Sequence, residues 1–374
     1  MTNDRELERK VGLTFVPGMN ADVLRAIIDR DLPLEDFYGL DVQTLPKRLG
    51  MLPTASRFEK AHRDEALFRA RQEVEFMKRH HVHAYTLLDD DYPLLLREVP
   101  DPPVVLFKIG EGRLDGEHFL NLVGSRRPTG YGCEFCSTFV RDMAAYFPDL
   151  CVVSGLAHGI DSMAHTAALD NNVETVAVVA HGLDTIYPAA NRDLAARIVK
   201  SGGAIVSEYP MHTIPYPKHF LQRNRIIAAL CYLTIVVESE VRGGAMNTAN
   251  TANSYSREVM AVPGRINDQM SSGCNHLISR QKAHILTSVP DVIELLDWRP
   301  LGHRIDARQR NLFPELEGDR RTIYDILKYK AEPVSVDSLC RETNIPIATL
   351  MSHLTEMEFD GMIVKLPGAR YSIS

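Results

Sequence analysis

The sequence predicts an α/β protein built on a doubly wound, mostly parallel sheet, with a small helical domain before the sheet and a winged helix after it. Three observations lead to this prediction. Short apolar runs bounded by Gly, Ser or Pro alternate with helical stretches from about residue 119 to 296, as in a parallel sheet covered by helices on both faces. The first 70 or so residues lack strand alternation. Residues 319–374 contain three helical patterns followed by a hairpin.

Residues 1–75 are predicted to form the small helical domain. The stretch VGLTFVPGMNADVLRAIIDR, residues 11–30, places a Pro-Gly turn between two apolar helical patterns. That pattern is typical of a helix-hairpin-helix or SAM-like domain, and an ordinary helical hairpin fits it equally well. In residues 89–110, DDDYPLLLREVPDPPVVLFKIG, the prolines indicate a connecting segment rather than a helix.

The central domain is predicted to span residues 85–298. Its strand candidates are FLNLVG, CVVSG, TVAVVAHG, GAIVSE, YLTIVVES, EVMAVPG and AHILTS. In a doubly wound sheet, ligands bind beyond the carboxyl ends of the strands. The residues to examine therefore follow these runs: Gly124-Ser125-Arg126, Ser154-Gly155, His181-Gly182, Ser207-Glu208, Glu238-Ser239 and Pro263-Gly264.

A polar linker is predicted at residues 299–318, and a winged helix at 319–374. The expected helices lie at about 320–330, 335–342 and 346–358, and GMIVKLPGARYSIS supplies two short strands around a Pro-Gly turn. This last domain holds seven Lys and Arg against eight Asp and Glu, whereas a domain that reads a DNA groove is usually basic. We therefore expect it to contact protein rather than DNA.

Composition excludes several classes of protein. The 374 residues are 45% hydrophobic and 24% charged, which is typical of a globular chain. The charged start MTNDRELERK is unlike a signal peptide, and no apolar run is long enough to span a membrane. We expect a cytoplasmic protein with no membrane partner, and its six cysteines are expected to be reduced. Because the formal net charge is −7, any anion site must be local.

The segment LVGSRRPTGYGCEF predicts a phosphate cradle at the end of the first parallel strand. Gly124 lets the backbone approach a ligand, the Ser125 hydroxyl and free helix N–H groups donate to phosphate, and Arg126 adds a forked charge. Many strand-to-helix turns carry Gly and Ser for geometry alone, so this motif leaves both interpretations open. The chain has no P-loop motif, and Phe135 stands where a dinucleotide fingerprint needs its third glycine.

The segment KHFLQRNRIIAAL predicts a second anion anchor. In a helix over residues 221–230, Arg223 and Arg225 would lie in the first turn, where the macrodipole disfavours cations. A bound phosphate would offset that mismatch. The alternative is that both arginines pair with carboxylates such as Glu208 and Glu238.

Other reactive groups are interpreted as structural, and we expect no metal and no cofactor. Cys133 and Cys136 form a C-x-x-C motif without partners for zinc, so they are expected to be buried helix cysteines. In SGLAHGIDSMAH, His158 and His165 are too far apart to form an i, i+4 ligand pair. Asp161 is expected to cap the helix start.

These motifs together resemble the DNA-processing protein A family, DprA/Smf. The family pattern appears as LVGSRRPTGYG, VVSGLAHGIDSMAHTAAL, GLDTIYPAANRDL, IVSEYP, FLQRNRIIAAL and GGAMNTANTANSYSREVMAVPG followed by GCNHLI. The resemblance covers about Tyr92 to Leu286. It implies an extended Rossmann-like central domain and agrees with the flanking helical and winged-helix domains.

The resemblance implies a non-enzymatic function. Members of the family bind single-stranded DNA in a basic pocket, form homodimers, protect incoming strands during natural transformation and help to load the RecA recombinase. In this chain the implied DNA-binding residues are Gly124, Ser125, Arg126, Lys218, Phe220, Arg223, Asn224 and Arg225. The family's usual Ser-Gly-Ser is replaced by Arg242-Gly243-Gly244-Ala245, where Arg242 could supply the missing contact.

Two alternatives come from other classes of protein. Rossmann-like phosphoribohydrolases carry P-G-G-x-G-T-x-x-E at a similar place. Here Met246 and Asn247 replace its Gly-Thr, and Asn250 replaces its catalytic Glu. A winged-helix transcription factor is the second alternative, which the charge count of residues 319–374 disfavours.

Overall fold

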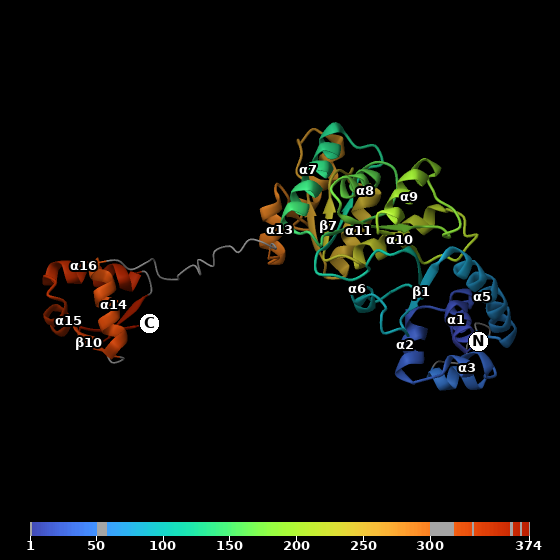
Figure 1. The fold of residues 1–374 in the computed structure, drawn as a ribbon, viewed down its shortest axis with the longest axis horizontal. Coiled ribbons are helices and arrows are strands. Elements are labelled where there is room, and N and C mark those ends of the chain that lie inside the picture. Colours follow the sequence, from blue (N-terminus) through green and yellow to red (C-terminus); the bar gives the residue numbers. More distant parts are fainter. Residues whose placement is uncertain are drawn as a thin grey trace. The chain divides into compact units, whose positions relative to one another are not determined.

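The computed structural model describes residues 2–50, 58–299, 318–330, 333–359, 362–366 and 369–373. The chain divides into two compact units, residues 1–301 and 302–374, and each is considered by itself (Figure 1). Residues 300–317, which hold most of the predicted linker, lie outside the described residues. Within the described ranges, no helix combines the length and apolar character that crossing a membrane requires.

The first unit begins with helices, drawn in blue in Figure 1. They are α1 (Thr2–Gly12), the 3-10 turn η1 (Leu13–Phe15), α2 (Ala21–Asp29), α3 (Leu34–Gly39), α4 (Thr44–Leu49) and α5 (Lys60–His80). The expected Pro-Gly turn separates η1 from α2, and the Asn20 side chain caps α2 by accepting the N–H of Val23 at 3.0 Å. Helix α5 packs against α1 and leads into the sheet.

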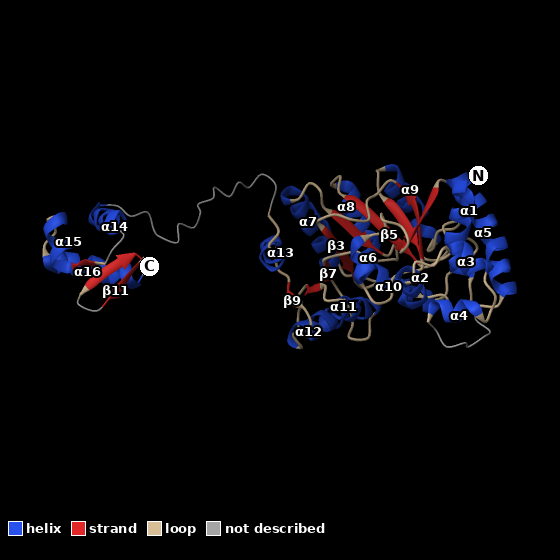
Figure 2. Ribbon diagram, turned by 90° about the horizontal axis from the view of Figure 1, so that it is seen from below, coloured by secondary structure: helices blue, strands red, loops and turns tan. Residues whose placement is uncertain are grey.

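A nine-stranded sheet forms the centre of the described part of the first unit (Figure 2). The strands are β1 (Val82–Thr86), β2 (Val105–Gly110), β3 (Phe119–Val123), β4 (Cys151–Ser154), β5 (Glu174–Val179), β6 (Ala204–Ser207), β7 (Leu233–Val236), β8 (Glu258–Ala261) and β9 (His284–Ile285). Their order is β1-β2-β6-β5-β4-β3-β7-β8-β9, and all pairs from β6 to β9 are parallel. The predicted doubly wound, mostly parallel sheet is confirmed.

One edge of the sheet differs from the sequence prediction. The segment 89–110, interpreted as a connecting segment, contains helix α6 (Leu94–Glu98) and strand β2. Strand β2 pairs antiparallel with β6 on one side and with β1 on the other. Pro100, Pro102 and Pro103 all precede Val105, the first residue of β2, so no proline interrupts the hydrogen bonds of this strand.

Helices cover both faces of this sheet. They are α7 (Gly130–Tyr146), α8 (Ile160–Asp170), η2 (Ala189–Asn191), α9 (Arg192–Lys200), α10 (Pro217–Ala229), α11 (Gly244–Ser254), η3 (Gln269–Ser271), α12 (Ser272–Ser279) and α13 (Val289–Leu296). Alternate residues of β3 lie on opposite faces of the sheet and belong to two different hydrophobic cores. Leu120 and Leu122 belong to the core under α7, α8 and α13, whereas Phe119 and Val123 belong to the core under α10 and α11.

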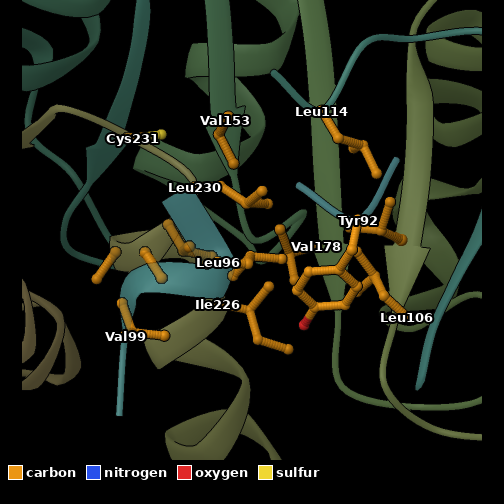
Figure 3. Close-up of a cluster of buried hydrophobic side chains, with 14 of the residues drawn as sticks. Tyr92, Leu96, Val99, Leu106, Leu114, Val153, Val178, Ile226, Leu230 and Cys231 are labelled. Atoms are coloured by element: carbon orange, nitrogen blue, oxygen red, sulfur yellow. The ribbon is translucent and has the colours of Figure 1, made fainter. Parts of the chain in front are cut away.

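The core under α10 also includes the segment before β2 (Figure 3). Tyr92 and Leu96 pack with Val178 of β5 and with Ile226 of α10. The Tyr92 hydroxyl donates to the carbonyl oxygen of Pro103 at 3.0 Å. Helix α10 therefore packs against the sheet and also against this segment. Both contacts fix the position of the residues at its start.

The second unit contains α14 (Gly318–Lys330), β10 (Val334–Ser335), α15 (Val336–Thr343), α16 (Ile347–Phe359), β11 (Ile363–Leu366) and β12 (Arg370–Ile373). Its described strands form a sheet in the order β10-β12-β11. Leu339, Leu350 and Leu354 lie in a separate buried core of this unit. The three helices and the following hairpin confirm the predicted winged helix.

Candidate functional site

A pocket of about 420 Å³ lies at the carboxyl edge of the sheet. The loops after β3, β4 and β7 and the helices α10 and α11 surround it, and we call it the edge pocket. Its polar and aromatic lining consists of Ser125, Arg126, Asp161, Phe220, Arg223, Asn224, Ser239, Glu240 and Thr248, together with Gly124, Gly243 and Gly244. Six of the nine predicted site residues are thus brought together: Gly124, Ser125, Arg126, Phe220, Arg223 and Asn224.

The loop after β3 is held tightly against the end of β7. The Ser125 N–H donates to the carbonyl oxygen of Glu238 at 2.7 Å. A Cβ at Gly124 would lie 2.6 Å from Ile160 Cγ1, so only glycine permits this approach. The buried Glu238 carboxylate accepts the Thr129 N–H at 2.8 Å and also the Thr129 hydroxyl. Glu238 therefore anchors the start of α7 and does not pair with Arg223 or Arg225.

Helix α10 starts at Pro217, four residues before the predicted start, because proline suits the first position of a helix. Phe220, Arg223 and Asn224 are spaced i, i+3, i+4, and they lie on the face toward the edge pocket. Lys218, Gln222 and Arg225 are spaced i, i+4, i+7 and lie on another stripe of the helix. None of these three is among the residues that line the edge pocket.

Arg223 forms the floor of the edge pocket and is only 3% exposed. Its Nη1 donates to the carbonyl oxygens of Gly155, at 2.6 Å, and Val178, and its Nε donates to Asn224 Oδ1 at 3.2 Å. Within the described ranges no hydrogen bond uses Nη2. Burial lowers the pKa of Arg223 to about 10, which leaves the guanidinium charged at neutral pH.

Phe220 and Arg126 form the wall of the edge pocket. The Arg126 Cζ lies 5.6 Å from the centroid of the Phe220 ring, and the Arg223 Cζ lies 5.9 Å from it. Arg126 is exposed and makes no ion pair within the described part of the chain. The pocket therefore brings one aromatic ring and two cations together.

The start of α11 lies on the opposite side of the edge pocket. Its N-cap is Gly243, which supplies no capping side chain, so the first turn, whose Gly244 and Ala245 line the pocket, has no side-chain acceptor for its N–H groups. Arg242 is exposed and is not among the lining residues. The hydroxyl contacts implied by the usual Ser-Gly-Ser are absent here, whereas the backbone donors are retained.

Two carboxylates limit the positive character of the edge pocket. Asp161 is buried beside Arg223, and its Oδ2 accepts the N–H of Ala157 at 3.4 Å. Burial raises the pKa of Asp161, and the charge of Arg223 opposes that rise. Glu240 accepts a hydrogen bond from Gln269 Nε2 at 3.1 Å. The expectation that Asp161 caps α8 is wrong, because Gly159 is the N-cap and no side chain caps it; Asp161 instead bonds the loop that precedes the helix.

Arg225 lies against carboxylates on the other side of α10. Its Nη2 pairs with Glu208, and its Nη1 donates to the carbonyl oxygen of Asp101 at 2.7 Å. These residues line a second pocket of about 490 Å³ that also contains Asp22 and Gln222. Arg225 thus follows the carboxylate-pairing alternative that the sequence left open, with Glu208 as its partner.

The cysteines of the C-x-x-C motif and His165 lie among structural contacts rather than in a reactive site. Cys133 and Cys136 are free thiols on α7. The buried His165 Nδ1 bonds the Thr175 hydroxyl at 2.7 Å, and burial lowers the pKa of His165 to about 3. In the described ranges, no group of three potential ligand side chains could hold a metal ion.

Sequence reasoning missed Tyr187, whose ring centroid lies 5.8 Å from that of Phe220. Its position did carry a signal, because it belongs to the long loop after β5, at the same edge of the sheet. Only His181 and Gly182 were named at this strand end, although the family motif GLDTIYPAANRDL contains Tyr187.

Comparisons with known proteins agree with this geometry. The family model for DNA recombination-mediator protein A matches residues 83–297, and the model for the DprA winged helix domain matches residues 309–369. The chain is 34% identical over 283 residues to Protein Smf of Escherichia coli, covering 74% of each chain. It is 37% identical over 307 residues to a putative DNA processing protein DprA of Mycobacterium tuberculosis, covering 79% of this chain and 78% of the relative.

Two solved structures are also similar. The X-ray structure of DprA from Streptococcus pneumoniae matches with a TM-score of 0.62 and 32% identity, covering 78% of this chain and 96% of that one. A structure of DNA processing protein A from Helicobacter pylori, solved to study its single-stranded DNA binding mode, matches with a TM-score of 0.51 and 30% identity. It covers 58% of this chain and 97% of that one.

Proposed function

Because this chain belongs to the DNA-processing protein A family, DprA/Smf, we propose that it binds single-stranded DNA in the edge pocket. In this proposal it protects incoming strands as a homodimer and helps to load the RecA recombinase during natural transformation and recombination. The similarity to the Helicobacter pylori protein supports the choice of a single strand as ligand.

One arrangement carries the proposal: the guanidinium carbons of Arg126 and Arg223 lie 5.6 and 5.9 Å from the centroid of the Phe220 ring, in a pocket that the first turn of α11 also lines. Cations and backbone N–H groups suit phosphate oxygens, and the half-buried Phe220 ring that lines the pocket suits any base. The pocket offers no regular row of side chains that could enter a DNA groove and read base edges. We therefore expect preference for single strands with little sequence specificity.

We propose that the protein acts as a binding protein rather than as an enzyme. At Asn250, where the phosphoribohydrolase motif has its glutamate, the side-chain Oδ1 accepts a hydrogen bond from Lys282 Nζ at 3.2 Å. Asn250 is exposed and is not among the residues lining the edge pocket. The hydrolytic alternative therefore lacks its carboxylate at that position.

The test compares the affinity for a single-stranded oligonucleotide with that for a blunt duplex of the same sequence, across a salt series. Tighter binding of the single strand is expected, with a salt slope that grows by about 0.7 for each phosphate neutralised. Phe220→Ala should cost about 1–3 kcal/mol of binding free energy with little change in slope. Equal affinity for the duplex would contradict the proposal.

A nucleotide-hydrolysis assay on the same preparation tests the absence of catalysis. No turnover is expected with or without divalent metal. Turnover that survives purification and disappears in strand-end variants such as Ser125→Ala would instead support an enzyme.

A further inference from the structure

A groove of about 690 Å³ lies between α7 and the start of α13, and we call it the α7 groove. The two helices pack against each other in the sheet domain (Figure 1). Segment 287–290 forms one wall of the groove. The wall on α7 includes Tyr131, Glu134, Phe135, Phe139 and Asp142. No residue lines both this groove and the edge pocket, so an occupant of one leaves the lining of the other free.

The α7 groove has the length of a helix rather than that of a small molecule. Its lining on α7 extends from Tyr131 to Tyr146, which is about 22 Å at a rise of about 1.5 Å per residue. The lining positions recur every three or four residues, so they form one stripe along α7. An amphipathic helix of about four turns would lie along such a stripe, as in helix-in-groove recognition.

Aromatic rings supply the apolar part of the groove. The Phe135 and Phe139 rings stack with their centroids 5.3 Å apart and 13° between their planes. Phe139 is 4% exposed and belongs to the core, whereas Phe135 is partly buried and Tyr131 is 47% exposed. Tyr131 is held in place because its hydroxyl donates to the carbonyl oxygen of Pro263 at 2.8 Å. The groove therefore presents open aromatic surface on a firm base, which can bury apolar side chains of a partner.

The charged side chains that line the groove are negative. Glu134 is exposed and makes no ion pair within the described ranges. In the same ranges Asp142 pairs only with its neighbour Arg141, at 3.0 Å, and these two side chains are 46% and 62% exposed. Such an exposed pair is weak, so a cation from a partner can replace Arg141. Among the described residues that line the groove there is no Lys or Arg.

The facing wall disfavours an anionic occupant. The Asp291 carboxylate accepts the N–H of Thr287 at 2.7 Å and the N–H of Ser288 at 2.9 Å. Ser288 and Asp291 form a capping box at the start of α13, so this helix end already has acceptors for its N–H groups. A phosphate would meet two carboxylates in the groove, whereas a cation would be attracted by both.

We propose that the α7 groove binds a basic amphipathic helix of a partner protein. Apolar side chains of that helix would pack against Tyr131 and Phe135, and its Lys or Arg side chains would pair with Glu134 and Asp142. The two carboxylates are eight residues apart on α7, about 12 Å along its axis, so the matching cations lie about two turns apart on the partner. This inference goes beyond DNA binding and does not depend on it, because the edge pocket has a different lining.

The test measures fluorescence anisotropy of the full chain with a labelled synthetic peptide of about sixteen residues. The peptide carries Leu at helical spacing on one face, two Lys about two turns apart beside that face, and Ala elsewhere. A second peptide has Gln in place of both Lys, and a third has the first composition in an order without an apolar face. The Lys peptide should bind about 2- to 30-fold more tightly than the Gln peptide, the range for two exposed ion pairs. The third peptide should not bind.

Variants of the groove locate the binding site. Glu134→Gln should weaken the Lys peptide by about 1.4- to 5-fold, the range for one exposed pair, and should not affect the Gln peptide. Glu294→Gln is the matched control, because Glu294 is exposed on α13 but does not line the groove. Phe135→Ala should weaken both peptides by about 5-fold or more, since an aromatic anchor is lost. Thermal unfolding checks that each variant keeps the fold, and every variant should bind single-stranded DNA as the native protein does.

Four results would overturn the proposal. If the Lys peptide does not bind, or binds no better than the Gln peptide, the carboxylates do not select a basic helix. If Glu134→Gln and Phe135→Ala both bind the Lys peptide normally, its site lies elsewhere. If Phe135→Ala changes light scattering while no peptide binds, the groove joins two copies of this chain. If Glu134→Gln, with its fold intact, loses DNA binding but keeps peptide binding, the groove belongs to the DNA site. Failure of the edge pocket to bind DNA would leave this inference unaffected.

Discussion

Arg223 of α10 donates through Nη1 to the carbonyl oxygen of Gly155, 68 residues away in the sequence, at 2.6 Å. The same nitrogen donates to Val178, so this arginine joins three segments at the carboxyl edge of the sheet. Arg223→Ala would leave both buried carbonyl oxygens without a donor, at about 1–3 kcal/mol each. We expect a lower free energy of unfolding as well as weaker DNA binding, measured by urea unfolding and anisotropy.

Arg223→Lys provides the comparison. Lysine keeps the charge but has one ammonium in place of the planar guanidinium, so it cannot hold both carbonyl oxygens through Nη1 and also Asn224 through Nε. It should therefore recover part of the affinity and little of the stability. Normal stability of Arg223→Ala would contradict the structural role of this guanidinium.

Arg126→Ala should affect binding alone. Arg126 is exposed and contacts Phe220 only through its guanidinium, 5.6 Å from the ring centroid. The free energy of unfolding should stay within about 0.5 kcal/mol of the native value. The salt slope of single-strand binding should fall by about 0.7, since one phosphate contact is lost. An unchanged slope with reduced affinity would indicate that Arg126 does not contact a phosphate.

Arg225→Ala should lower the stability of the fold and leave the salt slope of DNA binding unchanged. Its side chain is 20% exposed and pairs with Glu208, which is 15% exposed. Removing one partner of such a buried pair costs up to about 3–5 kcal/mol, because the other charge remains buried. The double variant with Glu208→Ala should recover part of that loss. Urea unfolding of the native protein, Arg225→Ala, Glu208→Ala and the double variant measures the coupling energy between the two side chains. The salt slope of DNA binding should not change. If Arg225→Ala instead had normal stability and a salt slope reduced by about 0.7, Arg225 would contact a DNA phosphate.

Helix geometry explains why the sequence predicted only part of the site. Residues two positions apart lie about 200° apart around a helix, so Arg223 and Arg225 cannot both face one pocket once α10 includes both. The helix expected over residues 221–230 already contained both arginines, so assigning both to one anion site overlooked this constraint. The pairing of Arg225 with Glu208 depends on the segment before β2, which closes the far side of α10.

The sheet was easier to predict at its centre than at its edge. The runs that form β3 to β9 are apolar and end in Gly, Ser or Pro, and the structure contains a strand at each. Strands β1 and β2 are partly exposed on an antiparallel edge, and the prolines before β2 resemble those of a loop. Burial on both faces produces the clear pattern, and an edge strand lacks it.

Glu73 of α5 should make stability depend on pH. Its carboxylate accepts the N–H of Met211 at 3.0 Å, and burial raises the pKa of Glu73 from 4.5 to about 7. The pKa of this carboxyl is higher in the folded chain than in the unfolded chain. Protonated Glu73 therefore stabilises the fold at pH values below its unfolded-state pKa. This stabilisation is lost as the pH rises through its folded-state pKa. The free energy of unfolding should therefore fall between about pH 4.5 and pH 7, by up to about 3 kcal/mol relative to Glu73→Gln.

Urea unfolding of both proteins across this range checks the prediction. The difference between the two curves isolates Glu73, because buried histidines such as His165 contribute equally to both. Parallel curves would show that Glu73 titrates normally in the folded protein.

We expect helix α16 of the winged helix to contact protein rather than DNA. Helix α16 contains no Lys or Arg, and Glu356 on it pairs with Arg320. Ile347 is 57% exposed and Met351 is 36% exposed on the same helix, one turn apart. Apolar side chains beside carboxylates suit a protein partner better than a phosphate backbone.

Ending the chain near residue 317 should therefore leave single-strand affinity within a few-fold while changing assembly or partner binding. The second unit has its own buried core, so its removal should not unfold the sheet domain. Anisotropy measures the affinity of the shortened protein, and light scattering of both proteins measures their assembly. Ile347→Ser with Met351→Ser in the full chain should reproduce the change in assembly, since both alter exposed apolar side chains without touching the core. If the isolated winged helix instead bound duplex DNA specifically at physiological salt, it would be a DNA reader, and the transcription-factor alternative would be restored.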